Sequence, residues 1–227
     1  TADHAWRALG EGLIFVNQDK EYVPWLAKDW SISADGVVWT FNIQEGVQFH
    51  KGRGEMTAED VVWSMQEMAR EDSLQSLKGQ IARLWNTEAG GARVVDKYTV
   101  EVNSGEAYAD MLNTMSRHHI NIYSKQATEE LGEEAAFEEA VATGAWVKDE
   151  IKPGEFWRMT AVEDHWRKSP EFAELILWHI PEESTRVANF KVGKLDTFEM
   201  ALDSLPAIAE EPDTKFMRVP GATGLAL

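Results

Sequence analysis

The chain has 227 residues, of which 44% are hydrophobic and 27% are charged, and it contains no cysteine. This length and apolar content suffice for the core of one large domain or two small ones, and the absence of cysteine excludes disulfides, thiolate nucleophiles and cysteine metal sites. The formal net charge of −17 disfavours nucleic-acid binding, because neutralising phosphates requires clustered Lys and Arg. We interpret the acidity mainly as a contribution to solubility, with a saline habitat or a cationic ligand as the alternative contributors.

The first strong pattern is an alternation of apolar and polar residues on both sides of Asp35-Gly36. Period-two alternation around an Asp-Gly pair predicts a β-hairpin. We expect each strand to place one apolar face on a core, with Trp30 and Trp39 among the core residues.

A helix is predicted directly after this hairpin. Thr57 stands at the N-cap position and Asp60 follows three residues later, in the spacing of a capping box. Val61, Met65 and Met68 share one face of this helix, which we expect to be buried.

The rest of the chain mixes helical and strand patterns. Helices are expected at 74–84, 108–115, 126–131, 134–142, 183–192 and 205–210, with Gly132, Gly144 and Gly193 as C-terminal stops. A second hairpin is expected at 94–103 with its turn at Asp96-Lys97, and further strands at 120–122, 156–162, 175–180, 195–200 and 215–219. Hairpins early and β-α-β order late predict a mixed α/β fold that contains an antiparallel subdomain.

Several motifs, in order along the chain, resemble one protein family. They are Glu11-Gly12-Leu13, Pro24-Trp25-Leu26-Ala27 with Trp30, Asp35-Gly36, Trp39-Thr40-Phe41, Gly46-Val47, Phe49-His50, Thr57-Ala58-Glu59-Asp60-Val61, Thr143-Gly144-Ala145-Trp146, and Ala188, Gly193 and Asp196. Together they resemble the family 5 extracellular solute-binding proteins, the peptide/nickel-type receptors of ABC importers. The chain departs from the family pattern at Ala145, where Pro is usual, and at Val141-Ala142, where a Gly is common.

The resemblance implies a two-lobed, periplasmic-binding-protein-like fold of type II, cluster C. Family members are much longer than this chain, so we expect it to contain only the first lobe, with the second lobe absent. On this view residues 11–123 form a small inserted α+β subdomain, while 1–10 and 124–219 form the larger α/β subdomain. Residues 220–227 would begin the hinge to the other lobe.

The implied function is that of the substrate-binding component of an ABC importer. It would capture an oligopeptide or dipeptide by clamp closure and deliver it to the membrane permease subunits, at the periplasmic side or the cell surface. We expect no enzyme activity, no cofactor and no resident metal. A short oligosaccharide or a metal chelate is the alternative solute, and a sensor or chemoreceptor partner uses the same fold.

Candidate ligand-binding residues come from segments that resemble cleft-lining parts of the family. They are Arg117, His118, His119, Ser73, Leu74, Trp146, Thr223 and Gly224. His118 and His119 are adjacent on an extended segment and point to opposite faces, so they are poorly placed to chelate one metal together. Trp85 and Trp146 lie at element ends, where either core packing or a place in the cleft is open.

A secreted hydrolase is the alternative from another class. Acidic pairs such as Glu129-Glu130 and Glu133-Glu134 invite a paired-carboxylate interpretation. They lie on polar helix-like stretches, which favours a solvated face. The pairs His50 with Glu55 and His165 with Asp164 have no nucleophile motif beside them.

Overall fold

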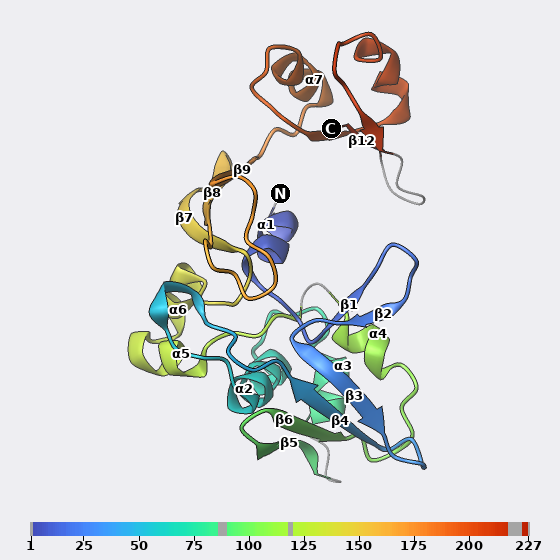
Figure 1. Cartoon of the computed structure of the whole chain (residues 1–227), viewed down its shortest axis with the longest axis vertical. Coiled ribbons are helices and arrows are strands. Elements are labelled where there is room, and N and C mark those ends of the chain that lie inside the picture. The colour runs from blue at the N-terminus through green and yellow to red at the C-terminus, as the bar shows by residue number, and fades with distance from the viewer. Residues whose placement is uncertain (1, 86–89, 118–119, 218–223, 227) are drawn as a thin grey trace. The chain divides into compact units, whose positions relative to one another are not determined.

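The structure is a computed structural model that describes residues 2–85, 90–117, 120–217 and 224–226. The chain divides into two compact units, of which the larger comprises Thr1–Lys152 and Trp157–Leu177 and the smaller comprises Pro153–Phe156 and Trp178–Leu227. The larger unit carries most of the secondary structure (Figure 1).

The larger unit contains six α-helices among the described residues. They are α1 (Ala2–Leu9), α2 (Ala58–Ala69), α3 (Lys78–Trp85), α4 (Met111–Met115), α5 (Lys125–Leu131) and α6 (Glu133–Glu139), with one 3-10 turn at His50–Gly52. Its strands are β1 (Ile14–Val16), β2 (Tyr22–Pro24), β3 (Ala27–Ile32), β4 (Val38–Ile43), β5 (Gly91–Asp96), β6 (Thr99–Asn103), β7 (Trp146–Lys152), β8 (Phe156–Ala161) and β9 (Glu174–Trp178).

The central sheet has the order β3-β4-β6-β5, and all its neighbouring strands are antiparallel. The predicted hairpin is confirmed, since Trp30 pairs with Phe41 across β3 and β4. Trp39 and Phe41 face the core, whereas Ile32 at the end of β3 is exposed. Helices α2 and α3 pack against β5 and β6 (Figure 1). This sheet and its helices enclose the main core, which extends from Leu13 to Val141.

The predicted helix cap is confirmed in α2. The Asp60 carboxylate accepts hydrogen bonds from the backbone N–H and the hydroxyl of Thr57, at 2.9 and 3.0 Å. Val61, Met65 and Met68 lie buried on one face of the helix. The second hairpin is also confirmed, as β5 and β6 pair antiparallel. Its turn lies at Lys97-Tyr98 and not at the predicted Asp96-Lys97, because Asp96 is still paired with Thr99.

Several sequence predictions in the larger unit are wrong in part or in full, and the helix expected at 108–115 begins only at Met111. The helix expected from Leu74 begins only at Lys78, because the preceding residues form turns in which the Ser73 hydroxyl accepts a hydrogen bond from the N–H of Gln75. Ile120 and Ile122 are fully buried but form no strand; the N–H of Ile122 instead donates to the carbonyl of Glu11. Gly144 ends no helix, since α6 ends at the left-handed Ala140.

The short strands β1 and β2, the helix α1 and the strand β7 had no counterpart among the predicted elements. The helix α1 and the strand β7 lie in one region. Both belong to a second, smaller core of Ala5, Leu9, Ala140, Trp146 and Met159. The strands β7, β8 and β9 form a three-stranded sheet in that order. Residues 8–10 and 144–146 of this region lie next to each other, because Gly144 donates its N–H to the carbonyl of Leu9 at 2.9 Å.

The smaller unit contains α7 (Glu183–Lys191), β10 (Phe198–Met200), β11 (Phe216–Met217), β12 (Gly224–Ala226) and a 3-10 helix at Leu202–Ala207. Its sheet has the order β10-β12-β11. Phe198, Met200 and Ile208 form its small core. The predicted helix at 183–192 is confirmed, whereas the helix expected at 205–210 is replaced by the earlier 3-10 turn, which contains Pro206.

Candidate functional site

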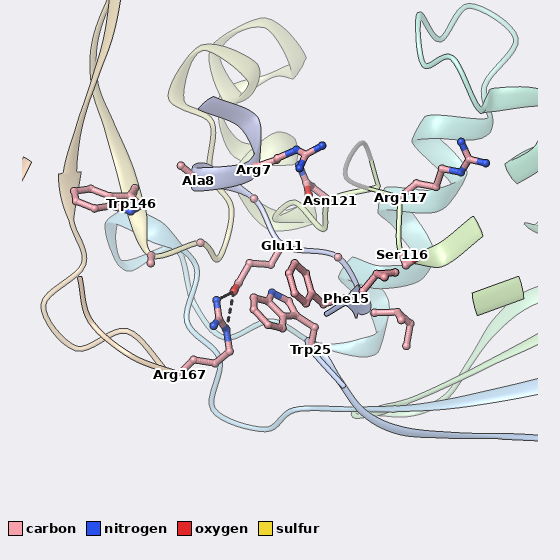
Figure 2. Close-up of a pocket in the computed structure, with 16 residues that line it drawn as sticks. Arg7, Ala8, Glu11, Phe15, Trp25, Ser116, Arg117, Asn121, Trp146 and Arg167 are labelled. Carbon is pink, nitrogen blue, oxygen red and sulfur yellow. Dashed lines mark hydrogen bonds and ion pairs between the residues drawn. The ribbon is translucent and has the colours of Figure 1, made fainter. Parts of the chain in front are cut away.

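A cavity of about 400 Å³ opens in the larger unit. Its volume lies within the range of small-molecule sites, which is roughly 300 to 1,000 Å³. The lining comes from segments far apart in sequence, as Figure 2 shows: Arg7, Ala8, Gly10, Glu11, Gly12, Ile14, Phe15, Val16, Trp25, Ser116, Arg117, Asn121, Gly144, Ala145, Trp146 and Arg167.

Glu11 lines this cavity and is buried, and its carboxylate accepts several hydrogen bonds. Its side chain is only 4% exposed. Arg167 donates to Oε1 from Nε at 3.2 Å and from Nη2 at 2.9 Å. The Trp166 ring N–H and the Thr143 hydroxyl donate to Oε2 at 2.8 and 3.1 Å. The Glu11 clasp, meaning Glu11 with Thr143, Trp166 and Arg167, therefore joins three distant segments.

The sequence around Glu11 allows this arrangement because glycines flank it. A Cβ on Gly10 would lie 2.6 Å from the side chain of Asn121, and one on Gly12 would lie 2.6 Å from the carbonyl oxygen of Ile120. Only glycine permits so close a passage between the two segments. The close passage carries the Glu11 side chain into the interior.

The clasp keeps Glu11 ionised. Burial by itself raises the pKa of Glu11, but interactions with His165, Trp166 and Arg167 outweigh it and hold that pKa below its ordinary value. His165 Nε2 lies 3.6 Å from the carboxylate and donates to the carbonyl of Thr143 at 3.0 Å. The Glu11 carboxylate therefore stays negative and paired with the Arg167 guanidinium.

A stack of three side chains adjoins the clasp. The guanidinium carbon of Arg167 lies 3.5 Å from the centroid of the Trp25 ring. The Phe15 ring lies 4.5 Å from Trp25 with an angle of 24° between the planes. Figure 2 shows the order Glu11, Arg167, Trp25, Phe15 along this wall of the cavity. We call Phe15, Trp25 and Arg167 the aromatic stack.

His50 supports the turn at 142–144, which carries Thr143 of the clasp. Its Nε2 donates to the carbonyl of Gly144 at 2.8 Å, and the N–H of Ala142 points at Nδ1 at 3.4 Å. Burial lowers the pKa of His50, so the ring is neutral near pH 7. A Cβ on Gly144 would lie 2.4 Å from the carbonyl oxygen of Ala8, so this turn requires glycine.

Two of the predicted ligand-binding residues line the cavity. The Arg117 side chain is exposed and makes no ion pair within the part of the chain that the structure describes. Trp146 is nearly buried and its ring lies 5.1 Å from that of Phe172, so it combines core packing with a place in the lining. Trp85 lies wholly in the core.

The other described residues of the prediction are not part of the cavity lining. Ser73 and Leu74 are outside the cavity lining, and Leu74 is fully exposed. Gly224 begins β12 in the smaller unit, while His118, His119 and Thr223 lie outside the described residues. Ligand binding by any of these residues stays a prediction.

Sequence reasoning missed the Glu11 clasp and the aromatic stack as site features. Glu11 and Trp25 were noted only as parts of family motifs, and His165 only as a neighbour of Asp164. Glu11 and Arg167 are separated by 156 residues. No local periodicity or spacing connects such residues, so the sequence carries no signal of their contact.

Comparison with known families places the chain among proteins that bind solutes. The family model described as "Bacterial extracellular solute-binding proteins, family 5 Middle" matches residues 21–227. The nickel-binding periplasmic protein of Escherichia coli K12 is 23% identical over 211 residues, covering 89% of this chain and 38% of the relative. Heme-binding protein A of Haemophilus influenzae is 26% identical over 188 residues, covering 76% and 34%.

Solved structures show the same fold. The periplasmic binding protein DppA of Helicobacter pylori, in complex with the peptide STSA, has a TM-score of 0.81 at 20% identity. The match covers 92% of this chain and 44% of the DppA chain. NikZ of Campylobacter jejuni, in complex with Ni(L-His), has a TM-score of 0.84 at 22% identity, with 93% and 42% covered. The predicted periplasmic-binding-protein-like α/β fold is thereby confirmed, and the chain spans less than half the length of these relatives.

The described residues hold neither a cluster of metal ligands nor a membrane-spanning helix. Across 2–85, 90–117, 120–217 and 224–226, no group of three or more His, Asp or Glu side chains is arranged to hold a metal ion. Over the same ranges, no helix has the length and apolar character needed to span a bilayer.

Proposed function

Because this chain belongs to the bacterial extracellular solute-binding proteins, family 5, we propose that it serves as the solute-binding component of an ABC importer. The match of the family model to residues 21–227 is the observation that carries this proposal. The relatives reported above are named as binding proteins, which favours capture of a solute over the alternative of a secreted hydrolase.

In the proposed mechanism the protein acts as a clamp. The solute enters between two lobes, of which this chain supplies the first, and the lobes close about a hinge. Residues 11–123 would form the inserted subdomain of this lobe, 1–10 and 124–219 the larger subdomain, and 220–227 the start of the hinge. The closed form then delivers the solute to the permease at the outer side of the membrane.

We assign the solute contacts of this lobe to the 400 Å³ cavity. Arg117 provides a guanidinium that can bind a carboxylate through charge-assisted hydrogen bonds. A peptide carries such a carboxylate at its C-terminus, and the complexes of related structures with the peptide STSA and with Met-Leu support an oligopeptide or dipeptide.

A metal chelate is the second candidate solute. The complex of NikZ with Ni(L-His) and the nickel-binding relative favour it. Carboxylates of a chelator would use Arg117 in the same way as a peptide terminus. A short oligosaccharide remains a third candidate in the same fold.

Calorimetry with the native, full-length protein tests the proposal. We expect the dipeptide Ala-Ala or the tripeptide Ala-Ala-Ala to bind, and Arg117→Gln to weaken that binding by about tenfold. Arg83→Gln is the matched control, since Arg83 is exposed, pairs with Glu106 and lies outside the cavity lining. Absence of peptide binding together with binding of a nickel–histidine complex would replace the peptide by the chelate.

The two-lobe mechanism has its own test. The 227-residue chain alone should bind the same peptides much more weakly than the full-length protein, since the contacts from the other lobe are missing. Equal affinities in calorimetry would contradict clamp closure. Turnover of peptides or glycosides by the full-length protein would instead support the hydrolase.

A further inference from the structure

The aromatic stack consists of side chains that contact one another directly. Arg167 covers one face of Trp25 at 3.5 Å, and Phe15 stacks beside Trp25 at 4.5 Å. All three residues line the cavity. The Phe15 ring ends the stack and remains 44% exposed, so part of its surface is open to a solute.

Both ends of the stack are held in place by contacts with the rest of the larger unit. The Arg167 guanidinium lies between the Trp25 ring and the buried Glu11 carboxylate, to which it donates two hydrogen bonds. Phe15 belongs to β1, where it is paired in register with Val23 of β2. A platform fixed at both ends presents its ring with little loss of conformational entropy on binding.

The charges of the lining are opposite in sign to those of the chain. Among its described residues, Arg7, Arg117 and Arg167 are cationic and Glu11 alone is anionic. Glu11 is already bonded to Arg167, whereas Arg117 is exposed and makes no ion pair among the described residues, so its guanidinium provides a positive charge in the lining, within a chain of net charge −17. A local cationic lining within an acidic protein indicates a solute group of negative charge.

We propose that this cavity selects anionic solutes that carry a flat aromatic or conjugated group, which stacks on Phe15 while Arg117 binds the anion. The proposal rests on the proposed solute-binding function and narrows its substrate class. Aromatic rings prefer offset stacking with centroids about 4.5 to 7 Å apart, and a saturated ring of the same size lacks the flat π-face that this arrangement requires.

The test compares two dipeptides that differ only in ring saturation. The probes are Ala-Phe and Ala-cyclohexylalanine, measured by calorimetry on the native, full-length protein, with Ala-Ala as the reference peptide. We expect Ala-Phe to bind about threefold to tenfold more tightly than its saturated counterpart. Phe15→Leu should abolish this preference because leucine offers no ring.

Tyr22→Leu is the matched control. Tyr22 lies on the neighbouring strand β2 and is 40% exposed, close to the exposure of Phe15, but it is outside the cavity lining. This variant should keep the full preference for Ala-Phe. The far-ultraviolet circular dichroism and the Tm of both variants should match those of the native protein, since both positions lie on the surface.

The outcomes separate this inference from the proposed function. Equal affinities for the two ring-bearing peptides, or a preference that survives Phe15→Leu, would overturn the inference while peptide binding stands. If none of the three peptides binds, the peptide assignment fails. Hydrocinnamate and cyclohexanepropionate then decide the inference, which is overturned unless the aromatic acid binds more tightly.

Discussion

Two buried carboxylates, Glu11 and Asp60, meet opposite electrostatic environments. Glu11 faces the Arg167 guanidinium, a ring N–H and a hydroxyl. Asp60 accepts only neutral donors: the N–H and hydroxyl of Thr57 and the N–H of Lys125, the last at 3.0 Å. Burial raises the pKa of Asp60 and its hydrogen bonds do not offset the rise, whereas in Glu11 the bonding partners prevail.

The difference shows what each carboxylate does. Asp60 lies in the first turn of α2, completes its capping box and ties it to the start of α5, so it supports the scaffold. Glu11 holds the Arg167 guanidinium in place and thereby supports the aromatic stack. Both carboxylates are buried, but only Glu11 forms an ionic contact, because a guanidinium from a distant segment packs against it.

Of the substitutions considered, removal of the Glu11 carboxylate should lower the free energy of unfolding most. Glu11→Ala leaves Arg167, Trp166 and Thr143 without their shared acceptor, and we expect the free energy of unfolding to fall by about 3 kcal/mol in urea titrations. Glu45→Ala is the control, since Glu45 pairs with Lys28 on the surface, and it should change stability by about 0 to 1 kcal/mol. Similar losses in both variants would show that the clasp is no stronger than a surface pair.

Gly144→Ala should disrupt the Glu11 clasp indirectly. The new Cβ would lie 2.4 Å from the carbonyl oxygen of Ala8 and displace the turn that carries Thr143, at a cost of about 2 kcal/mol. Gly79→Ala is the matched change in open space within α3 and should stabilise by about 0.5 to 1 kcal/mol. Thermal unfolding of the two variants should thus shift Tm in opposite directions, and a shift of the same sign would refute the close approach at Gly144.

Asp60→Ala removes the cap of α2 and the link to Lys125. We expect a loss of about 1 to 2 kcal/mol in the urea titration, less than for Glu11→Ala because no cation is left unpaired. Glu59→Ala in the same helical turn is the control, since Glu59 is exposed and should change stability little. A loss for Asp60→Ala above that for Glu11→Ala would invert the ranking.

The pH dependence should have opposite signs at the two sites. The pKa of folded Glu11 is below its ordinary value of 4.5, so its stabilisation is present above that pH and is lost as the pH falls through the folded pKa. The pKa of folded Asp60 is above its ordinary value of 3.8, so its contribution is fully present below that pH and is lost as the pH rises through the folded pKa.

Neutral variants isolate the two titrations. The stability advantage of the native protein over Glu11→Gln should shrink as the pH is lowered from 5 to 3, whereas its difference from Asp60→Asn should move in favour of the native protein. Urea midpoints at several pH values measure both. Parallel slopes for the two variants would contradict the assignment of opposite pKa directions.

The sequence by itself determined the local elements and the family. Asp35-Gly36 marks a hairpin turn, and Thr57 with Asp60 marks a cap, because these interactions act across a few neighbouring residues. The turn of the second hairpin lies one residue later than predicted, at Lys97-Tyr98. Leu74 and Ile120 were misassigned because an apolar residue in a turn or an irregular core segment imitates the spacing of a regular element.

Only the tertiary structure decided where the site lies. It joins Glu11 to Arg167 across 156 residues, stacks that guanidinium on Trp25 and brings Arg117 to the same cavity. Arg117 and Trp146 could be named from the family resemblance. The contacts of Arg167 with Glu11 and Trp25, which form one wall of the cavity, could not. Contacts between distant segments arise from packing of the whole unit, and the local patterns of a sequence carry no record of which charged residue will meet which.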